Sequence, residues 1–114
     1  MTTKLIIEGT DKNFDDEVIK SEIPTVVDFW ASWCAPCKAL VPTLEAVAKA
    51  YTDKVKVVKV DIERHQKVTQ KFGISSIPTL LFFKDGEVRG QIVGAVPRRK
   101  IDDAIDKMFE DERA

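Results

Sequence analysis

The residues of this chain best suited to chemistry are its two cysteines, Cys34 and Cys37, which are separated by two residues. They follow the apolar, strand-like segment 25–30 and open segment 34–51, in which apolar residues have helical spacing. Side chains three residues apart at a helix start are neighbours, so the two sulfurs could form a disulfide with small adjustment. The first helical turn also has unpaired N–H groups and the positive end of the helix dipole, which favour a thiolate on Cys34. The spacing therefore predicts thiol–disulfide exchange.

The two thiols are expected to have different roles. Cys34, at the very start of the helix, is predicted to be the exposed nucleophile that forms a mixed disulfide with a substrate. Cys37, one turn inward and more buried, is predicted to attack the Cys34 sulfur, which releases the reduced substrate and leaves a Cys34–Cys37 disulfide. Pro36 suits the first helical turn, where its missing N–H would have had no partner.

Two other interpretations of the cysteine pair remain open at this point. The thiols could be buried small hydrophobic groups, or they could be zinc ligands. Zinc takes about four ligands, and His65 is the one further soft ligand in the chain, so a metal site would have to be shared between two chains. A strand before the pair and a helix after it favour redox chemistry. His65 itself is expected to be an exposed surface residue without a catalytic role.

The elements that must position the pair alternate along the chain. We expect strands at 4–7, 25–30, 55–60, 79–83 and 87–93, and helices at 10–20, 34–51, 66–72 and 97–109. The order βαβαβαββα predicts an α/β fold with a mixed central sheet and helices on both faces. Asp85-Gly86 predicts a tight hairpin between the last two strands. No linker or repeat interrupts residues 1–114, so a single domain is expected.

Composition excludes several classes of function. The 114 residues are 44% hydrophobic and 32% charged, with a formal net charge of −1, so no basic surface for nucleic acid or anionic lipid is indicated. No apolar run approaches the roughly 20 residues that span a membrane. The N-terminal segment has only three consecutive apolar residues, fewer than the about 7–15 of a secretory signal. These features predict a cytoplasmic location.

A carboxylate stands inside the most apolar part of the chain. Asp28 has apolar neighbours on both sides in the segment Val26-Val27-Asp28-Phe29-Trp30, which argues for burial. Burial of a carboxylate without a strong partner raises its pKa. Such a group beneath the cysteines could accept the Cys37 proton as that thiol attacks. Trp30 is expected to be structural and to pack beneath the site.

At this point the sequence resembles the thioredoxin family along nearly its whole length. The motifs that carry the resemblance are Asp28-Phe29-Trp30-Ala31, Trp33-Cys34, Pro36-Cys37-Lys38, Pro42, Lys59-Val60-Asp61, Gly73-Ile74, Ile77-Pro78-Thr79, Lys84-Asp85-Gly86 and Val93-Gly94-Ala95. The resemblance implies the thioredoxin fold, with a five-stranded sheet and four helices. It also implies a monomeric protein-disulfide reductase that works as an electron carrier.

The resemblance further implies which residues support the cysteines. It assigns the role of proton acceptor to Asp28, with Lys59 as its neighbour. It implies a cis Ile77–Pro78 bond facing the cysteines, with the Ile77 backbone free to pair with an extended substrate segment. It implies an apolar rim that docks protein substrates, made of Trp33, Ala35, Pro36, Ile62, Ile77, Pro78, Val93, Gly94 and Ala95. The side chains of Ile62 and Val93 are expected to lie partly in the core.

The family also implies the partners. No cofactor is expected to be bound, and no nucleotide-binding glycine motif is present, so electrons must come from a separate reductase. The family default is an NADPH-dependent flavin enzyme, thioredoxin reductase, and a ferredoxin-linked reductase is the alternative. The substrates are disulfide-containing proteins.

The sequence departs from the family pattern at one position of the active-site motif, and two other functions remain as alternatives. Ala35 stands where most thioredoxins have glycine, which bears on the reduction potential. A disulfide oxidase or isomerase is disfavoured, because such relatives usually have histidine between the cysteines. A binding module that uses the fold without sulfur chemistry is the other alternative.

Overall fold

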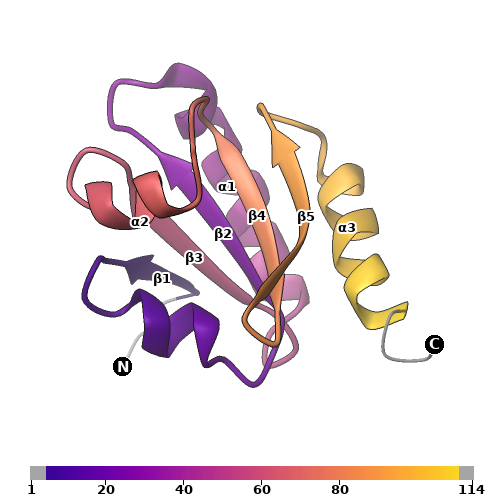
Figure 1. Cartoon of the computed structure of the whole chain (residues 1–114). Helices are drawn as coiled ribbons and strands as arrows, with labels where there is room; N and C mark the ends of the chain where they lie inside the picture. The colour runs from indigo at the N-terminus through magenta and orange to yellow at the C-terminus, as the bar shows by residue number, and fades with distance from the viewer. Residues whose placement is uncertain (1–4, 111–114) are drawn as a thin grey trace, which may run out of the picture.

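Five strands form one mixed sheet in the computed structural model, which describes residues 5–110. Their order across the sheet is β1-β3-β2-β4-β5 (Figure 1). The strands are β1 (Ile6–Gly9), β2 (Thr25–Trp30), β3 (Lys56–Asp61), β4 (Thr79–Lys84) and β5 (Glu87–Val93). β3 pairs parallel with both β1 and β2, whereas β4 pairs antiparallel with β2 and β5. The mixed sheet and the element order predicted from the sequence are therefore confirmed.

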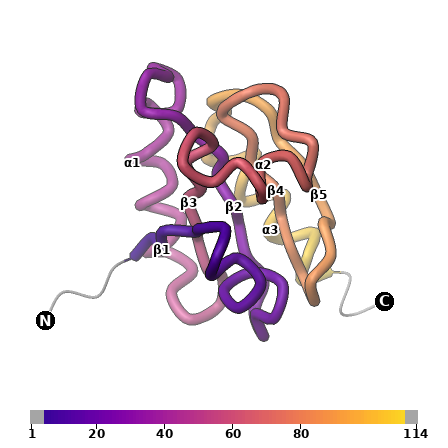
Figure 2. The backbone as a smooth tube through the Cα atoms, turned by 60° about the vertical axis from the view of Figure 1, so that its left-hand side comes forward, coloured from indigo at the N-terminus to yellow at the C-terminus, as the bar shows by residue number. Residues whose placement is uncertain are grey.

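Four helical segments cover the two faces of this sheet (Figure 2). They are η1 (Asp15–Ile19), α1 (Ala35–Ala50), α2 (Gln66–Lys71) and α3 (Arg98–Glu110). Helices α1 and α3 pack on one face, around a buried cluster that includes Val26, Val57 and Phe82. The opposite face packs with η1 and α2 around a second cluster that includes Val27, Phe29 and Val60.

Strand β2 lies at the centre of the sheet and is buried on both faces. Successive side chains of a strand alternate between faces, so Val26 contacts the α1 side and Val27 contacts the η1 side. Asp28 follows the same alternation and lies on the α1 side. Between Val26 and Trp30 the strand is therefore apolar on both faces except at Asp28, because a layer of helix covers each face.

Two predicted elements differ from the structure near the N-terminus. The first strand was expected at 4–7; it begins at Ile6 and ends at Gly9, and residue 4 lies outside the described residues. The helix expected at 10–20 is the shorter π-helix η1. Thr10 and Asn13 cap the turn that leads into it, because the side chain of each accepts the backbone N–H of the other at 2.7 and 3.0 Å.

The hairpin between β4 and β5 forms at the predicted Asp85-Gly86 turn. Both residues have positive φ angles, 52° at Asp85 and 78° at Gly86, as the hairpin turn requires. A Cβ on Gly86 would come within 3.0 Å of the Ile19 carbonyl oxygen, so this turn also packs against η1. Within residues 5–110, no helix has the length and apolar character needed to cross a bilayer.

Candidate active site

The cysteine pair lies at the junction of β2 and α1. β2 ends at Trp30, and a turn follows in which the Cys34 N–H donates to the Ala31 carbonyl oxygen at 3.1 Å. Helix α1 then begins at Ala35, with Cys34 as its N-cap residue and a proline in its first turn. The strand therefore delivers Cys34 to the helix N-terminus, and the helix places Cys37 one turn inward, as the sequence predicts.

The two sulfurs are joined in a disulfide, and the Cα atoms of Cys34 and Cys37 are 5.3 Å apart. The backbone N–H of Cys37 also donates to the Cys34 sulfur at 3.2 Å. In the reduced protein, a donor in this position would stabilise negative charge on that sulfur, as would the positive end of the α1 dipole. The geometry thus favours ionisation of Cys34 rather than of Cys37.

Both cysteines are buried in the disulfide form. The exposed fraction of Cys34 is 5% and that of Cys37 is 1%. Cys34 is the more accessible of the two, but the prediction that it is exposed was wrong. The two cysteines form a small buried cluster with Ala31, and the half-buried side chains of Trp30, Ile62 and Ile77 pack against it. Ile62 and Ile77 are distant from the pair in the sequence, and the degree to which they help to bury Cys34 was not predicted.

The residues predicted to form an apolar rim around the pair differ in exposure. Trp33 and Val93 are exposed at 65% and 53%, so Val93 is not part of the core. Ile62 is half-buried and packs against two of the clusters, in line with its expected part in the core. Of the remaining rim residues, Ala35, Pro36 and Ala95 are exposed, Ile77 and Gly94 are half-buried, and Pro78 is buried.

The loop before β4 meets the end of β5 at this surface. The Ile77–Pro78 peptide bond is cis. The Gly94 N–H donates to the Pro78 carbonyl oxygen at 2.8 Å, which ties the two segments together. Gly94 has a φ of 100° and would have open space around a Cβ, so its backbone dihedral, not a close approach, favours glycine there.

Asp28 is fully buried, with an exposed fraction of 0%, as its apolar neighbours predict. Neither of its carboxyl oxygens has a hydrogen-bond partner among the residues that the structure describes. Burial raises the pKa of Asp28 from 3.8 to about 7, and the charge of Lys59 opposes part of that rise. The group can therefore gain or lose a proton near neutral pH, which is what a general base requires.

Lys59 lies beside Asp28 as a register partner in the neighbouring strand. Its ammonium nitrogen lies 4.4 Å from the centroid of the Trp30 ring. A cation over an aromatic face is attracted by the ring quadrupole, so Trp30 holds the charge as well as packing against the cysteine cluster. The contact between Lys59 and Trp30 was missed from the sequence. A signal for it was present, because Trp30 is two residues from Asp28 on one strand and therefore lies on the same face as Asp28 and its neighbour Lys59.

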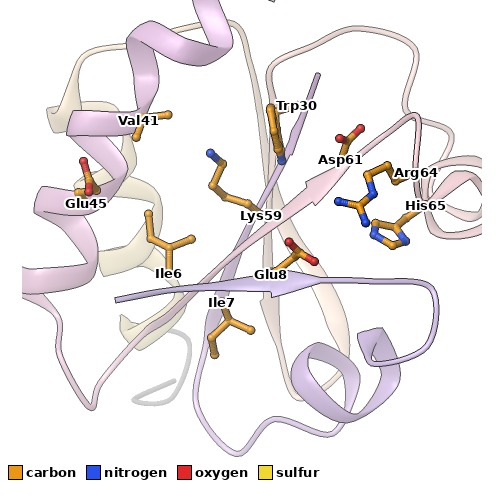
Figure 3. Close-up of a pocket in the computed structure, with 10 residues that line it drawn as sticks. All are labelled: Ile6, Ile7, Glu8, Trp30, Val41, Glu45, Lys59, Asp61, Arg64 and His65. Atoms are coloured by element: carbon orange, nitrogen blue, oxygen red, sulfur yellow. The ribbon is translucent and has the colours of Figure 1, made fainter. Parts of the chain in front are cut away.

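A cavity of about 480 Å³ opens next to Lys59 and Trp30 (Figure 3). Its polar lining was also missed from the sequence: the charged residues Glu8, Glu45, Asp61 and Arg64 contribute to it, together with His65. His65 is half-buried, not exposed as predicted, and its Nδ1 accepts the Asp11 N–H at 3.3 Å. No cluster of three or more potential metal ligands occurs in residues 5–110.

Comparison with known proteins settles the family. The thioredoxin family model matches residues 5–107. A protein named Thioredoxin C-2 from Corynebacterium nephridii is 51% identical over 102 residues, covering 90% of this chain and 94% of that protein. Thioredoxin 1 from Synechococcus elongatus is 47% identical over 98 residues, covering 86% and 92%. The chain belongs to the thioredoxin family.

This family member is a thiol–disulfide oxidoreductase that reduces protein disulfides through its redox-active cysteine pair. A further relative is named for a chloroplast. It is thioredoxin M-type, chloroplastic, from Pisum sativum, and it is 42% identical over 97 residues, which cover 85% of this chain and 56% of that protein. Disulfide-containing proteins and a reductase are the partners of such a thioredoxin.

Proposed function

We propose that the reduced protein begins each cycle with the Cys34 thiolate attacking one sulfur of a substrate disulfide. A new bond forms between Cys34 and that sulfur, and the other substrate sulfur leaves as a thiolate that takes a proton from water. The observation that carries this assignment is the Cys37 N–H directed at the Cys34 sulfur at the N-terminus of α1. This donor lowers the energy of the anion at the sulfur that must attack.

In the second step Cys37 resolves the mixed disulfide. Its thiol loses a proton, its sulfur attacks the Cys34 sulfur, and the second substrate thiolate leaves. The substrate gains two electrons and the Cys34–Cys37 pair loses two. Asp28 receives the Cys37 proton, and Lys59 adjusts the proton affinity of Asp28. The support for Asp28 in this role is its complete burial on the α1 side of β2 and its pKa of about 7.

Substrates dock on the apolar surface around the pair. Trp33 and Val93 supply exposed apolar area, and the backbone at Ile77 supplies hydrogen bonds to an extended segment of the substrate. Shape and backbone pairing select for accessible disulfides rather than for one side-chain sequence. The residues assigned to substrate binding are Trp33, Ala35, Pro36, Ile77, Pro78, Gly94 and Ala95.

The remaining assignments concern partners and place. We propose that a separate NADPH-dependent reductase returns two electrons to the Cys34–Cys37 disulfide, without a cofactor bound to this chain. The protein acts as a monomer of one domain in the cytoplasm and needs neither nucleic acid nor a membrane. The near-neutral net charge supports the proposal that the protein needs neither nucleic acid nor an anionic membrane surface.

A mixed-disulfide trap tests the order of the two steps. The Cys37→Ser variant, reduced and mixed with insulin, is expected to accumulate a covalent complex that dithiothreitol releases. The matched variant Cys34→Ser is expected to form none and to lose disulfide reduction altogether. A complex formed through Cys37 in the Cys34→Ser variant, or equal trapping by both variants, would contradict the assignment of the nucleophile.

A further inference from the structure

A polar row crosses the sheet beneath the edge of α1. Glu8 of β1 and Asp28 of β2 are both register partners of Lys59 in β3, so Lys59 stands between two carboxyl groups. Directly paired residues of neighbouring strands point to the same face, and such strands lie about 4.8 Å apart. The two carboxyl groups differ in setting, because Asp28 is fully buried and Glu8 is exposed.

The Lys59 ammonium is bound firmly to neither carboxyl group. It lies over the Trp30 ring, and within residues 5–110 no carboxylate oxygen comes within 4.0 Å of it. The four-carbon stem of lysine is flexible, so the position of this charge depends on the field around it. The ammonium can therefore shift toward Asp28 or toward the cavity according to the charges on each side.

Several charged side chains line the cavity beside Lys59. Among them, Glu8 is the residue that pairs in register with Lys59 across the sheet. Figure 3 shows the Glu8 carboxylate directed into the cavity, with Lys59 on one side and Arg64 on the other. The charged or titratable groups around Lys59 are Glu8 of β1, Asp28 of β2, Glu45 of α1, Asp61 of β3, and Arg64 and His65 before α2. Glu8 and Asp28 are the two that share the cross-strand row of Lys59.

We propose that Glu8 is a positioning residue for disulfide exchange, which draws the Lys59 ammonium toward the cavity and away from Asp28. The proposal rests on the proposed role of Asp28 as the proton acceptor. A cation near a carboxyl group favours its charged form, so Lys59 held toward Glu8 leaves the Asp28 carboxylate with a higher affinity for a proton. Glu8 thereby makes the ionised Asp28 a stronger base for the Cys37 proton.

The test replaces Glu8 by glutamine and follows the Asp28 carboxyl carbon by NMR during a pH titration of the oxidised protein at low salt. With Glu8→Gln, the Asp28 midpoint is expected to fall by about half a pH unit, because Lys59 is freed to approach it. The pH at which disulfide reduction reaches half its maximal rate should fall by a similar amount. Glu8→Asp should retain most of the wild-type midpoint.

Two controls separate this mechanism from a general change of charge. Asp15→Asn removes one exposed negative charge from η1, on the opposite face of the sheet, and should leave the Asp28 midpoint unchanged. In a Lys59→Gln background, Glu8→Gln should shift the midpoint by less than about 0.2 pH units, because the mediating cation is gone.

Either of two results would overturn the proposal. One is an Asp28 midpoint that Glu8→Gln moves no more than Asp15→Asn does. The other is a shift of equal size with and without Lys59, which would mean that Glu8 acts on Asp28 directly. The NMR titration needs no turnover, so a wild-type protein that titrates normally but reduces no disulfide would contradict the proposed function alone.

Discussion

The chemistry of this protein depends on unequal environments for groups of the same kind. Cys34 receives an N–H at its sulfur, whereas Cys37 lies one turn deeper and supplies that N–H from its own backbone. Among the acidic residues, Asp28 is fully buried, with no hydrogen-bond partner in the described part of the chain. In the proposed mechanism, environment and not residue type therefore separates the nucleophile from the resolving thiol and the proton acceptor from an ordinary surface acid.

At this scale the first prediction concerns Asp28→Asn. Because an asparagine cannot accept the Cys37 proton, we expect disulfide reduction at pH 7 to slow by about 100-fold, at the lower end of general-base effects. The wild-type rate should rise as pH increases through about 7, where Asp28 loses its proton, and the variant should lack that rise. Single-turnover reduction of insulin from pH 6 to 9 measures both.

The exposed acid Asp15 provides the comparison, since Asp15→Asn removes the same charge outside the site. Its rate profile should match wild type. An Asp28→Asn profile that coincides with wild type at every pH would remove Asp28 from the mechanism.

Residues whose setting depends on local sequence were predictable, and residues whose setting depends on strand register were not. The cysteine pair and the burial of Asp28 follow from their immediate neighbours. The family resemblance implied that Lys59 lies beside Asp28, but the Lys59–Trp30 contact and the place of Glu8 in the same row require knowing which residues of three separate strands lie side by side. The burial of Cys34 was missed because Ile62 and Ile77 approach it from other parts of the chain.

At the scale of elements, turns and caps decide where each segment begins. The segment η1 is shorter than the helix expected at 10–20, and the reciprocal bonds of Thr10 and Asn13 cap the turn that leads into it. α1 was predicted closely, since Cys34 and a first-turn proline mark its start. The β4–β5 hairpin was predictable from Asp85-Gly86, because these residue types tolerate positive φ angles.

This hairpin leads to the second prediction, for Gly86→Ala. The residue has a φ of 78°, and an added Cβ would lie 3.0 Å from the Ile19 carbonyl oxygen. We expect the free energy of unfolding to fall by about 1–3 kcal/mol, from the left-handed conformation and the close contact together. Urea unfolding of the oxidised protein at pH 7 measures the loss.

Gly90→Ala is the matched control, because the nearest atom to its added Cβ would be 3.7 Å away, in ordinary contact with Phe82. Its unfolding free energy should stay within about 0.5 kcal/mol of wild type. Equal effects of the two substitutions would show that the turn does not depend on glycine at position 86.

At the scale of the whole molecule, the buried acid opposes stability. Burial raises the folded-state pKa of Asp28 from 3.8 to about 7, with Lys59 offsetting part of the effect. Between about pH 4 and 7 the folded chain holds a proton that the unfolded chain has released. The free energy of unfolding therefore decreases as pH rises through this window, by up to about 4 kcal/mol for a difference of about three pH units.

The third prediction follows for the same Asp28→Asn variant that is expected to lose activity. At pH 8 its free energy of unfolding should exceed that of wild type by about 2–4 kcal/mol, because no charge has to be buried. At pH 4 the difference should nearly vanish. Urea unfolding of both oxidised proteins at the two pH values tests this, and a variant less stable than wild type at pH 8 would contradict it.

The sulfur bond links residues only three apart, at the tip of one helix. Opening it releases a small ring, whose closure constrains an unfolded chain far less than a long loop would. The sheet pairings and the two large apolar clusters involve other residues, so none of them includes the two sulfurs. A cysteine pair placed in this way can alternate between dithiol and disulfide without being part of the framework that holds the fold together.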